Sequence, residues 1–105
     1  MRLRHKVDFE SVFRRSKKST DVCFAVLYRG NRLPYARLGL AISRRCARRA
    51  VVRNRIKRLV RESFRHQQPN LAGLDIVVIG KVTLVNCSNA ELFSSLSQHW
   101  QTLNQ

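Results

Sequence analysis

Three short runs of apolar residues along the chain have the composition of β-strands. They are rich in β-branched, aromatic and aliphatic side chains, and they lie at 22–28, 36–43 and 74–81. The third run has four consecutive β-branched residues, Ile76 to Ile79, and therefore predicts a strand that is covered on both faces. The first two runs flank a turn segment containing Gly30 and Pro34, so they could form an antiparallel hairpin.

Helical spacing of apolar residues marks three further segments, at 7–15, 50–66 and 88–103. Spacing close to 100° per residue places one set of side chains of the middle segment on a single face: Val52, Ile56, Leu59, Val60 and Ser63. The last segment begins with Ser88 and Glu91 at the spacing of a capping box. Its apolar side is supplied by Leu92, Phe93, Leu96, Trp100 and Leu103. Trp100 continues that stripe, which favours a core position over a base-stacking one.

The order of these segments predicts an α/β protein. A strand, a helix and a strand follow one another between 36 and 81, which implies a βαβ unit. The polar stretch 16–21 reads as a break, and 82–87 as a loop or a strand extension. The length of 105 residues and the lack of a linker or repeat predict one domain over 1–105.

The charge of the chain predicts a polyanionic binding partner. The chain has 21 basic and 6 acidic residues, a net charge of +15, and self-repulsion at that charge is relieved by a polyanion. Ten basic residues against Glu62 alone lie within 44–65. On the helix predicted there, Asn54, Arg58, Arg61 and Arg65 lie opposite the apolar face. Guanidinium groups bind phosphate through paired hydrogen bonds, so this face predicts a nucleic-acid contact.

Aromatic residues leave two alternatives open. Phe9 and Phe13 are four residues apart on the first predicted helix, and Phe24 and Tyr28 lie on one face of the first predicted strand. The four rings could line a groove in which unpaired bases stack. They could instead fill the core, and the sequence pattern alone favours this second alternative.

Catalytic, metal and membrane motifs give no positive signal. The three histidines (His5, His66 and His99) form no metal motif, and the six acids form no close pair that would hold two metal ions. Cys23, Cys46 and Cys87 predict no disulfide framework, and Cys23 is expected in the core. No apolar run is long enough for a membrane span, and the first residues do not resemble a signal peptide. We therefore expect a cytoplasmic protein with no catalytic residue and no metal site of its own.

The segment 44–65, RRCARRAVVRNRIKRLVRESFR, strongly resembles the signature of the bacterial ribonuclease P protein subunit. The flanking stretches RLRHKVDFESVF, RLGLAISRR and LDIVVIGK are also similar to the family, in the same order. The resemblance implies a two-layer α/β sandwich of order α-β-β-β-α-β-α, with a four-stranded mixed sheet and a left-handed βαβ crossover. It therefore requires a fourth strand, for which 29–36 and 82–87 are the candidate regions.

The resemblance also implies a function. In this family a large RNA carries the catalytic centre and its Mg²⁺ ions, and the enzyme removes the 5′ leader from precursor tRNA. The protein subunit binds the catalytic RNA and the single-stranded leader, and neither a cofactor in the protein nor an obligate protein partner is implied. Carried over by position, RNA binding falls to Ser43, Arg44, Arg45, Arg48, Arg49, Arg53, Asn54, Arg55, Lys57, Arg58 and Arg61. Leader binding falls to Phe9, Phe13 and Phe24, while Tyr28 stays open.

Two rival functions make different predictions. A general basic RNA-binding protein, such as an RNA chaperone or a ribosomal protein, would bind RNA broadly without preferring precursor tRNA. A protein-only ribonuclease would cleave RNA by itself and would depend on its histidines.

Overall fold

The computed structural model describes residues 16–104. The predicted helix over 7–15, with Phe9 and Phe13, lies outside the described residues. The elements within the described range are, in chain order, β1 (Lys17–Thr20), β2 (Phe24–Gly30), β3 (Arg37–Ala41), α2 (Ala50–Gln67), the 3-10 turn η1 (Gln68–Leu71), β4 (Leu74–Gly80), the 3-10 turn η2 (Val82–Asn86) and α3 (Asn89–Leu103).

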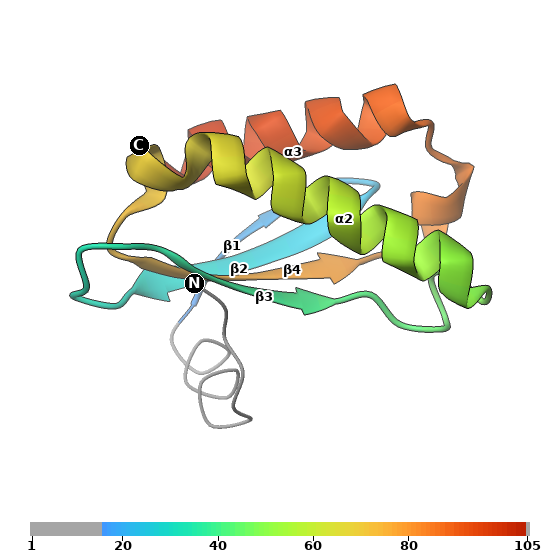
Figure 1. Cartoon of the computed structure of the whole chain (residues 1–105), viewed down its shortest axis with the longest axis horizontal. Helices are drawn as coiled ribbons and strands as arrows, with labels where there is room; N and C mark the ends of the chain where they lie inside the picture. Colours follow the sequence, from blue (N-terminus) through green and yellow to red (C-terminus); the bar gives the residue numbers. More distant parts are fainter. Residues whose placement is uncertain (1–15, 105) are drawn as a thin grey trace.

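The four strands form one mixed sheet, and both helices lie on the same face of it. The strand order is β1-β2-β4-β3, with β4 antiparallel to β2 and parallel to β3. Figure 1 shows α2 and α3 side by side above the sheet. The described part of the chain therefore has the two layers and the mixed sheet that the resemblance implies.

The βαβ unit predicted between 36 and 81 is confirmed, because β3, α2 and β4 follow one another and the two strands are parallel. The hairpin suggested for the first two apolar runs is wrong. β4 lies between β2 and β3 and forms hydrogen bonds with both of them. β4 is the most apolar strand, and the central position buries Ile76, Val77 and Val78 completely. The left-handed sense of the crossover stays a prediction.

The fourth strand lies in neither of the two expected regions. It is β1, in the stretch that the polar sequence marks as a break, and it pairs antiparallel with β2 from Lys17↔Tyr28 to Thr20↔Ala25. The strand is an edge strand, and Lys17, Lys18 and Thr20 are exposed. Lysines are tolerated and even useful on such an edge, because they discourage pairing with other chains. The stretch 82–87 instead contains η2.

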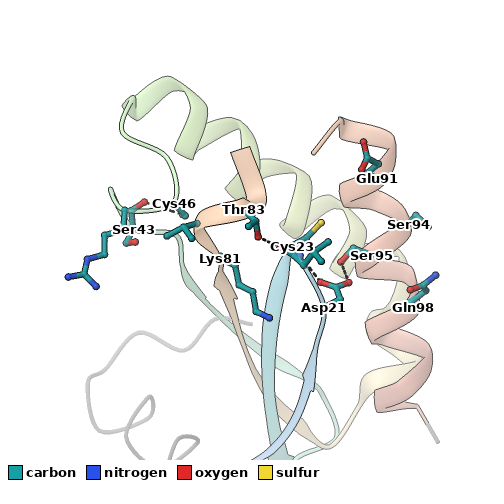
Figure 2. Close-up of a pocket in the computed structure, with 14 residues that line it drawn as sticks. Asp21, Cys23, Ser43, Cys46, Lys81, Thr83, Glu91, Ser94, Ser95 and Gln98 are labelled. Atoms are coloured by element: carbon teal, nitrogen blue, oxygen red, sulfur yellow. Dashed lines mark hydrogen bonds between the residues drawn. The ribbon is translucent and has the colours of Figure 1, made fainter. Parts of the chain in front are cut away.

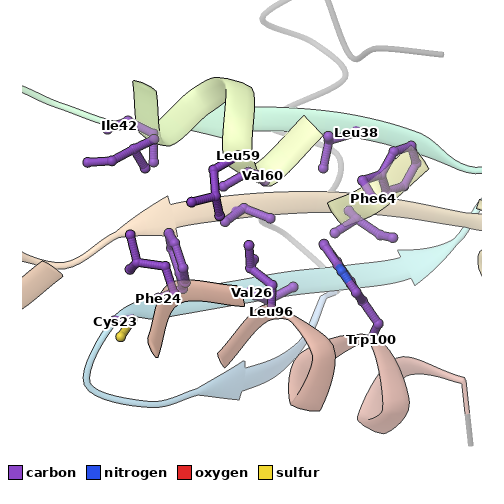
Figure 3. Close-up of a cluster of buried hydrophobic side chains, with 14 of the residues drawn as sticks. Cys23, Phe24, Val26, Leu38, Ile42, Leu59, Val60, Phe64, Leu96 and Trp100 are labelled. Atoms are coloured by element: carbon purple, nitrogen blue, oxygen red, sulfur yellow. The ribbon is translucent and has the colours of Figure 1, made fainter. Parts of the chain in front are cut away.

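The core lies between the sheet and the two helices (Figure 3). Phe24 and Val26 contribute from β2 in the sheet, while Val60 and Leu96 contribute from α2 and α3, and all four are fully buried. Trp100 is 2 % exposed and its indole Nε1 donates a hydrogen bond of 2.8 Å to Ser63 Oγ, which explains a serine on the apolar face of α2. The core position predicted for Trp100 is confirmed, whereas Phe93 is 42 % exposed and does not join the apolar side of α3.

Candidate nucleic-acid interface

Helix α2 has two chemically distinct faces. Four of the five residues that the helical spacing predicts for the inner face are buried, namely Ile56, Leu59, Val60 and Ser63, and Phe64 is buried with them. Val52, the fifth, is half-buried against the core. Asn54, Arg55 and Arg58 are exposed on the outer side, while Lys57 and Arg61 are half-buried. The apolar face fixes the helix on the sheet, so the outer face is free of any packing role and carries the basic groups into solvent.

The loop before α2 is built so that its arginines point outward. Cys46 and Ala47 are buried at 1 % and 2 % exposure, and both backbone N–H groups donate to the carbonyl of Ser43, at 3.2 Å. The small buried pair anchors the middle of the loop. The residues on either side of it are therefore exposed: Ser43, Arg44, Arg45, Arg48 and Arg49.

Arg53 is half-buried and holds this loop against the helix. Its Nη1 donates to the carbonyl of Ala47 at 2.9 Å and to the carbonyl of Arg48 at 2.8 Å. These carbonyls lie next to the loop arginines, so Arg53 sets the position of the loop in addition to carrying a charge. The sequence places Arg53 in the basic run but gives no sign of this second role.

The beginning of α2 is an electropositive site. The N-cap residue is Arg49, its side chain makes no capping hydrogen bond, and the first turn holds no acid. The first N–H groups of a helix lack partners inside the helix and carry partial positive charge. Four exposed arginines in the loop add full charges beside them. Such a helix start attracts phosphate.

Glu62, the one acidic residue of 44–65, neutralises only the end of the basic face. Its Oε1 lies 2.5 Å from Arg65 Nη2 and 3.2 Å from His66 Nε2. These contacts lower the pKa of Glu62, chiefly through the hydrogen bond from Arg65. Arg65 is therefore partly compensated, in contrast to Arg55 and Arg58 nearer the helix start.

Three hollows follow one another along the basic surface. The first is lined by Arg44, Arg45, Arg48, Ala50 and Arg53. The second is lined by Val51, Val52, Asn54, Arg55 and Arg58, and the third by Asn54, Arg58, Arg61, Glu62 and Arg65. Asn54 and Arg58 line both of the last two. Most of the sequence-predicted residues are therefore brought together along one surface, whereas Ser43, Arg49 and Lys57 line none of the three hollows.

The leader contact predicted for Phe24 is corrected by the structure. Phe24 is 0 % exposed and lies in the core on the helix side of β2, so its ring cannot stack on an unpaired base. Tyr28 lies on the same side and packs partly against that core. On the opposite side of the sheet a small apolar cluster is formed by Leu27, Val77 and Ile79. Phe9 and Phe13 lie outside the described residues.

A buried polar cluster at the start of β2 is absent from the sequence prediction. Asp21 accepts hydrogen bonds from Ser95 Oγ and from the backbone N–H groups of Cys23 and Phe24. His99, 3 % exposed, lies 3.2 Å from Asp21 Oδ2 through Nε2, and its Nδ1 lies 2.7 Å from Ser19 Oγ. Burial would raise the pKa of Asp21, but these hydrogen bonds and His99 lower it. The cluster joins α3 to the sheet, and its burial keeps His99 away from RNA.

The described range 16–104 contains no group of three or more His, Cys, Asp and Glu residues that could hold a metal ion. The same residues include no helix with the length and apolar character needed to cross a membrane.

Comparison with known proteins places this arrangement in a family. The model of the family described as Ribonuclease P matches residues 1–104. The chain is 44% identical to the ribonuclease P protein component of Thioalkalivibrio sulfidiphilus, over 99% of this chain and 87% of that protein. It is 46% identical to the corresponding protein of Nitrosococcus oceani, over 95% of this chain and 84% of that one.

Solved structures agree with the sequences. The RNase P protein from Thermotoga maritima has a TM-score of 0.86 and 33% identity, and the match covers 97% of this chain and 96% of that chain. The RNase P protein of Staphylococcus aureus has a TM-score of 0.89 and 26% identity, and the match covers 99% of this chain and 94% of that chain. The matched length, the identities and the shared fold show that this chain belongs to the ribonuclease P protein family.

Proposed function

We propose that the basic surface of the loop 43–49 and α2 binds the catalytic RNA of ribonuclease P. The family's protein is a subunit of an endoribonuclease whose catalysis resides on the RNA. The observation that carries the proposal is the row of three hollows lined by arginines on a face that packing does not use. The described residues hold no competing metal centre.

The mechanism of binding follows from the side chains. Each arginine that meets a phosphate releases condensed counterions, so the affinity falls as the salt concentration rises. The planar guanidinium groups of Arg55 and Arg58 suit paired hydrogen bonds to phosphate oxygens, and the first turn of α2 adds backbone N–H donors. Asn54, with a donor and an acceptor, suits a contact to a base edge or a 2′-hydroxyl group.

The RNA-binding set follows the sequence prediction with one refinement. Arg44, Arg45, Arg48, Arg49, Asn54, Arg55 and Arg58 are exposed and act as direct contacts, with Ser43 at the loop start. Lys57 and Arg61 contribute from the sides of the helix. Arg53 acts both on RNA and as the brace of the loop, because it donates to two loop carbonyls.

We further propose that the protein holds the 5′ leader of precursor tRNA while the catalytic RNA cuts. Phe9 and Phe13 are the residues that the family resemblance assigns to this contact. Phe24 is not among them, since it is buried. The protein then lies between two polyanions and reduces the repulsion between them, which lowers the Mg²⁺ concentration that the RNA needs. We propose a cytoplasmic location for the protein with this role.

Reconstitution tests the proposal. Precursor tRNA and the catalytic RNA are incubated at low Mg²⁺ with and without the full chain, and cleavage at the mature 5′ end is measured. We expect cleavage at low Mg²⁺ only with the protein. Equal cleavage in both reactions would contradict the proposal, and cleavage by the protein alone would favour a protein ribonuclease.

Competition separates this function from general RNA binding. The complex of the chain with the catalytic RNA is challenged with unrelated structured RNA of equal length. A dedicated subunit keeps its complex, whereas an RNA chaperone exchanges freely between the two RNAs. The affinities for precursor tRNA and for the corresponding mature tRNA are then compared, and their difference gives the contribution of the 5′ leader to binding.

A further inference from the structure

Two of the three cysteines of the chain face each other at a position that RNA binding does not use. The Sγ atoms of Cys23 and Cys87 are 3.0 Å apart although the residues are 64 positions apart in the chain. All three cysteines are free thiols. At this separation one thiol donates a weak hydrogen bond to the other sulfur.

Both cysteines are held by the backbone around them. Cys23 is 3 % exposed, its N–H donates to Asp21 Oδ1 at 2.9 Å, and its carbonyl accepts from Lys81 N–H at 3.0 Å. Cys87 is half-buried at the end of η2, and its N–H donates to the carbonyl of Leu84 at 3.1 Å. The two thiols are therefore brought together by the fold rather than by chance motion of free side chains.

Cys23 lines an open cleft, and its partner Cys87 is half-buried beside it. The cleft is lined by Cys23, by Lys81 between β4 and η2, and by residues of η2 and α3, among them Thr83, Ser95 and Gln98 (Figure 2). The third cysteine, Cys46, also lines the cleft but has a different partner, because its Sγ donates to the carbonyl of Ser43 at 3.1 Å. Cys46 therefore serves as an internal control.

We propose that Cys23 and Cys87 are a modification site, at which a peroxide converts the two thiols into a reversible disulfide. The Cys87 thiolate attacks the peroxide oxygen, the O–O bond breaks, and a sulfenic acid and an alcohol or water form. Cys23 then attacks the sulfenic sulfur, the S–O bond breaks, and water leaves with the Cys23 proton. Overall two thiols are oxidised by two electrons and the peroxide is reduced, and a small dithiol reverses the change by thiol–disulfide exchange.

The order of the two steps follows from the surroundings of each sulfur. Burial, and then the contact with Cys87, raise the pKa of Cys23 to about 12. The neighbouring Asp21 carboxylate acts in the same direction. Since the thiolate is the nucleophile, the more exposed Cys87 reacts first and Cys23 resolves the sulfenic acid.

The disulfide would join the start of β2 to the residue that precedes the N-cap of α3. The closed loop includes β2, β3, α2 and β4, and a cross-link across a loop of this length restricts the unfolded chain strongly. The modification therefore protects the folded protein during oxidation. Neither cysteine belongs to the RNA-binding set, although Ser43 and Arg45 of that set line the same cleft as Cys23. The modification adds to the proposed function and does not depend on it.

The experiment uses the reduced full chain, treated with hydrogen peroxide and then blocked with an alkylating reagent. Peptide mapping without reductant is expected to give one intramolecular Cys23–Cys87 cross-link, with Cys46 alkylated. The midpoint of thermal unfolding is expected to rise by roughly 10 °C and to return with dithiothreitol. A chain that keeps all three thiols, or links Cys46 or two molecules first, overturns the proposal.

Two variants provide matched controls. Cys87→Ser is expected to lose the cross-link and the thermal shift, whereas Cys46→Ala is expected to keep both. Circular dichroism of each reduced variant checks that it folds. If either variant is unfolded, the mapping of the unsubstituted chain decides alone. An equal thermal shift in oxidised Cys87→Ser would also overturn the proposal.

Discussion

Arg55 and Arg65 carry the same guanidinium group on the same helix, but their electrostatic surroundings differ. Arg65 lies 2.5 Å from Glu62, and this contact raises the pKa of Arg65. Arg55 lies exposed in the hollow that it shares with Asn54 and Arg58. The two residues therefore form a matched pair for testing which guanidinium groups meet RNA.

We expect Arg55→Ala to weaken binding of the catalytic RNA and to reduce the dependence of log K on log salt by about one unit, since one phosphate contact is lost. Arg65→Ala removes the same group from a compensated position, so its effect on the salt slope is expected to be smaller. Filter binding at several salt concentrations measures both. Equal slopes for the two variants would contradict direct phosphate binding by Arg55.

The buried carboxylate of Asp75 makes the free energy of unfolding depend on pH in the acidic range. It is 4 % exposed, and it accepts hydrogen bonds from Arg37 Nε at 2.7 Å, Arg37 Nη2 at 2.6 Å and Asn31 Nδ2 at 2.9 Å. Burial would raise the pKa of this carboxyl, but the hydrogen bonds from Arg37 and Asn31 hold the pKa below its ordinary value. A lowered pKa in the folded state means that acid favours the unfolded state.

The stabilisation from Asp75 is therefore complete above the unfolded pKa of about 3.9 and is lost as pH falls through the lower folded value. We expect the free energy of unfolding to decrease below about pH 5. Asp75→Asn should make this decrease shallower, and Asp21→Asn, at the second carboxyl with a lowered pKa, should do the same. Urea unfolding at a series of pH values measures the slope. An unchanged slope in Asp75→Asn would show that the ion pair does not govern it.

Phe24 and Arg53 have positions or contacts that the sequence pattern does not predict. Even spacing correctly places Phe24 and Tyr28 on one face of β2, but it does not say which layer covers that face. The helices cover it, so Phe24 becomes a core residue. The second role of Arg53 is equally hidden, since its acceptors are backbone carbonyls, which every residue possesses.

The two helices begin in opposite ways. In α3, Ser88 Oγ accepts from Glu91 N–H at 3.1 Å, and Glu91 Oε1 accepts from Ser88 N–H at 3.2 Å, which confirms the predicted capping box. In α2 the N-cap is Arg49, without a side-chain cap. The basic start of α2 is thus a less stable helix end that favours phosphate.

Arg49→Asp tests this balance. Aspartate at an N-cap accepts from the first backbone N–H groups and favours the helix dipole, so the folded state should gain about 1 kcal/mol. The same change places a negative charge where phosphate would bind, so RNA affinity should fall. Thermal unfolding and RNA titration measure the two effects.

Arg49→Ala is the control for the loss of charge alone. It should weaken RNA binding less than Arg49→Asp and should give no gain in stability. If Arg49→Asp leaves RNA binding unchanged, the start of α2 does not meet phosphate.

The sequence patterns predict most helices and strands, but they do not predict which strands pair in the sheet. The apolar runs and helical spacings correspond to β2, β3, β4, α2 and α3. β1 is missed because an exposed edge strand needs no apolar side chains, and Lys17 and Lys18 resemble a loop. The pairing of β2 with β4 is missed because alternation of side chains gives each strand a face but no neighbour.

At the scale of the whole molecule, the net charge of +15 destabilises the folded state through repulsion between like charges. The same charge favours binding of a polyanion such as RNA. Salt screens repulsion between exposed like charges. We expect the midpoint of thermal unfolding to rise when sodium chloride is increased from about 0.05 M to about 0.5 M, since the Debye length falls from above about 10 Å to below about 10 Å and the repulsion between exposed arginines weakens.

Sulfate at equal ionic strength should raise the midpoint further if anions occupy the hollows, because a ligand that binds the folded state stabilises it. Differential scanning fluorimetry measures both series. A midpoint that does not change with salt would mean that the arginines are already compensated within the fold.

The central position of β4 affects the order in which the sheet can form during synthesis. Strands β2 and β3 share no hydrogen bonds and are joined only through β4, which is formed by Leu74–Gly80. While the chain is still being synthesised, the arginine helix precedes the strand that completes the sheet on which it rests. The chain must therefore emerge from the ribosome as far as Gly80 before the four-stranded sheet can form. Until then α2 lacks the central strand of the sheet against which it packs.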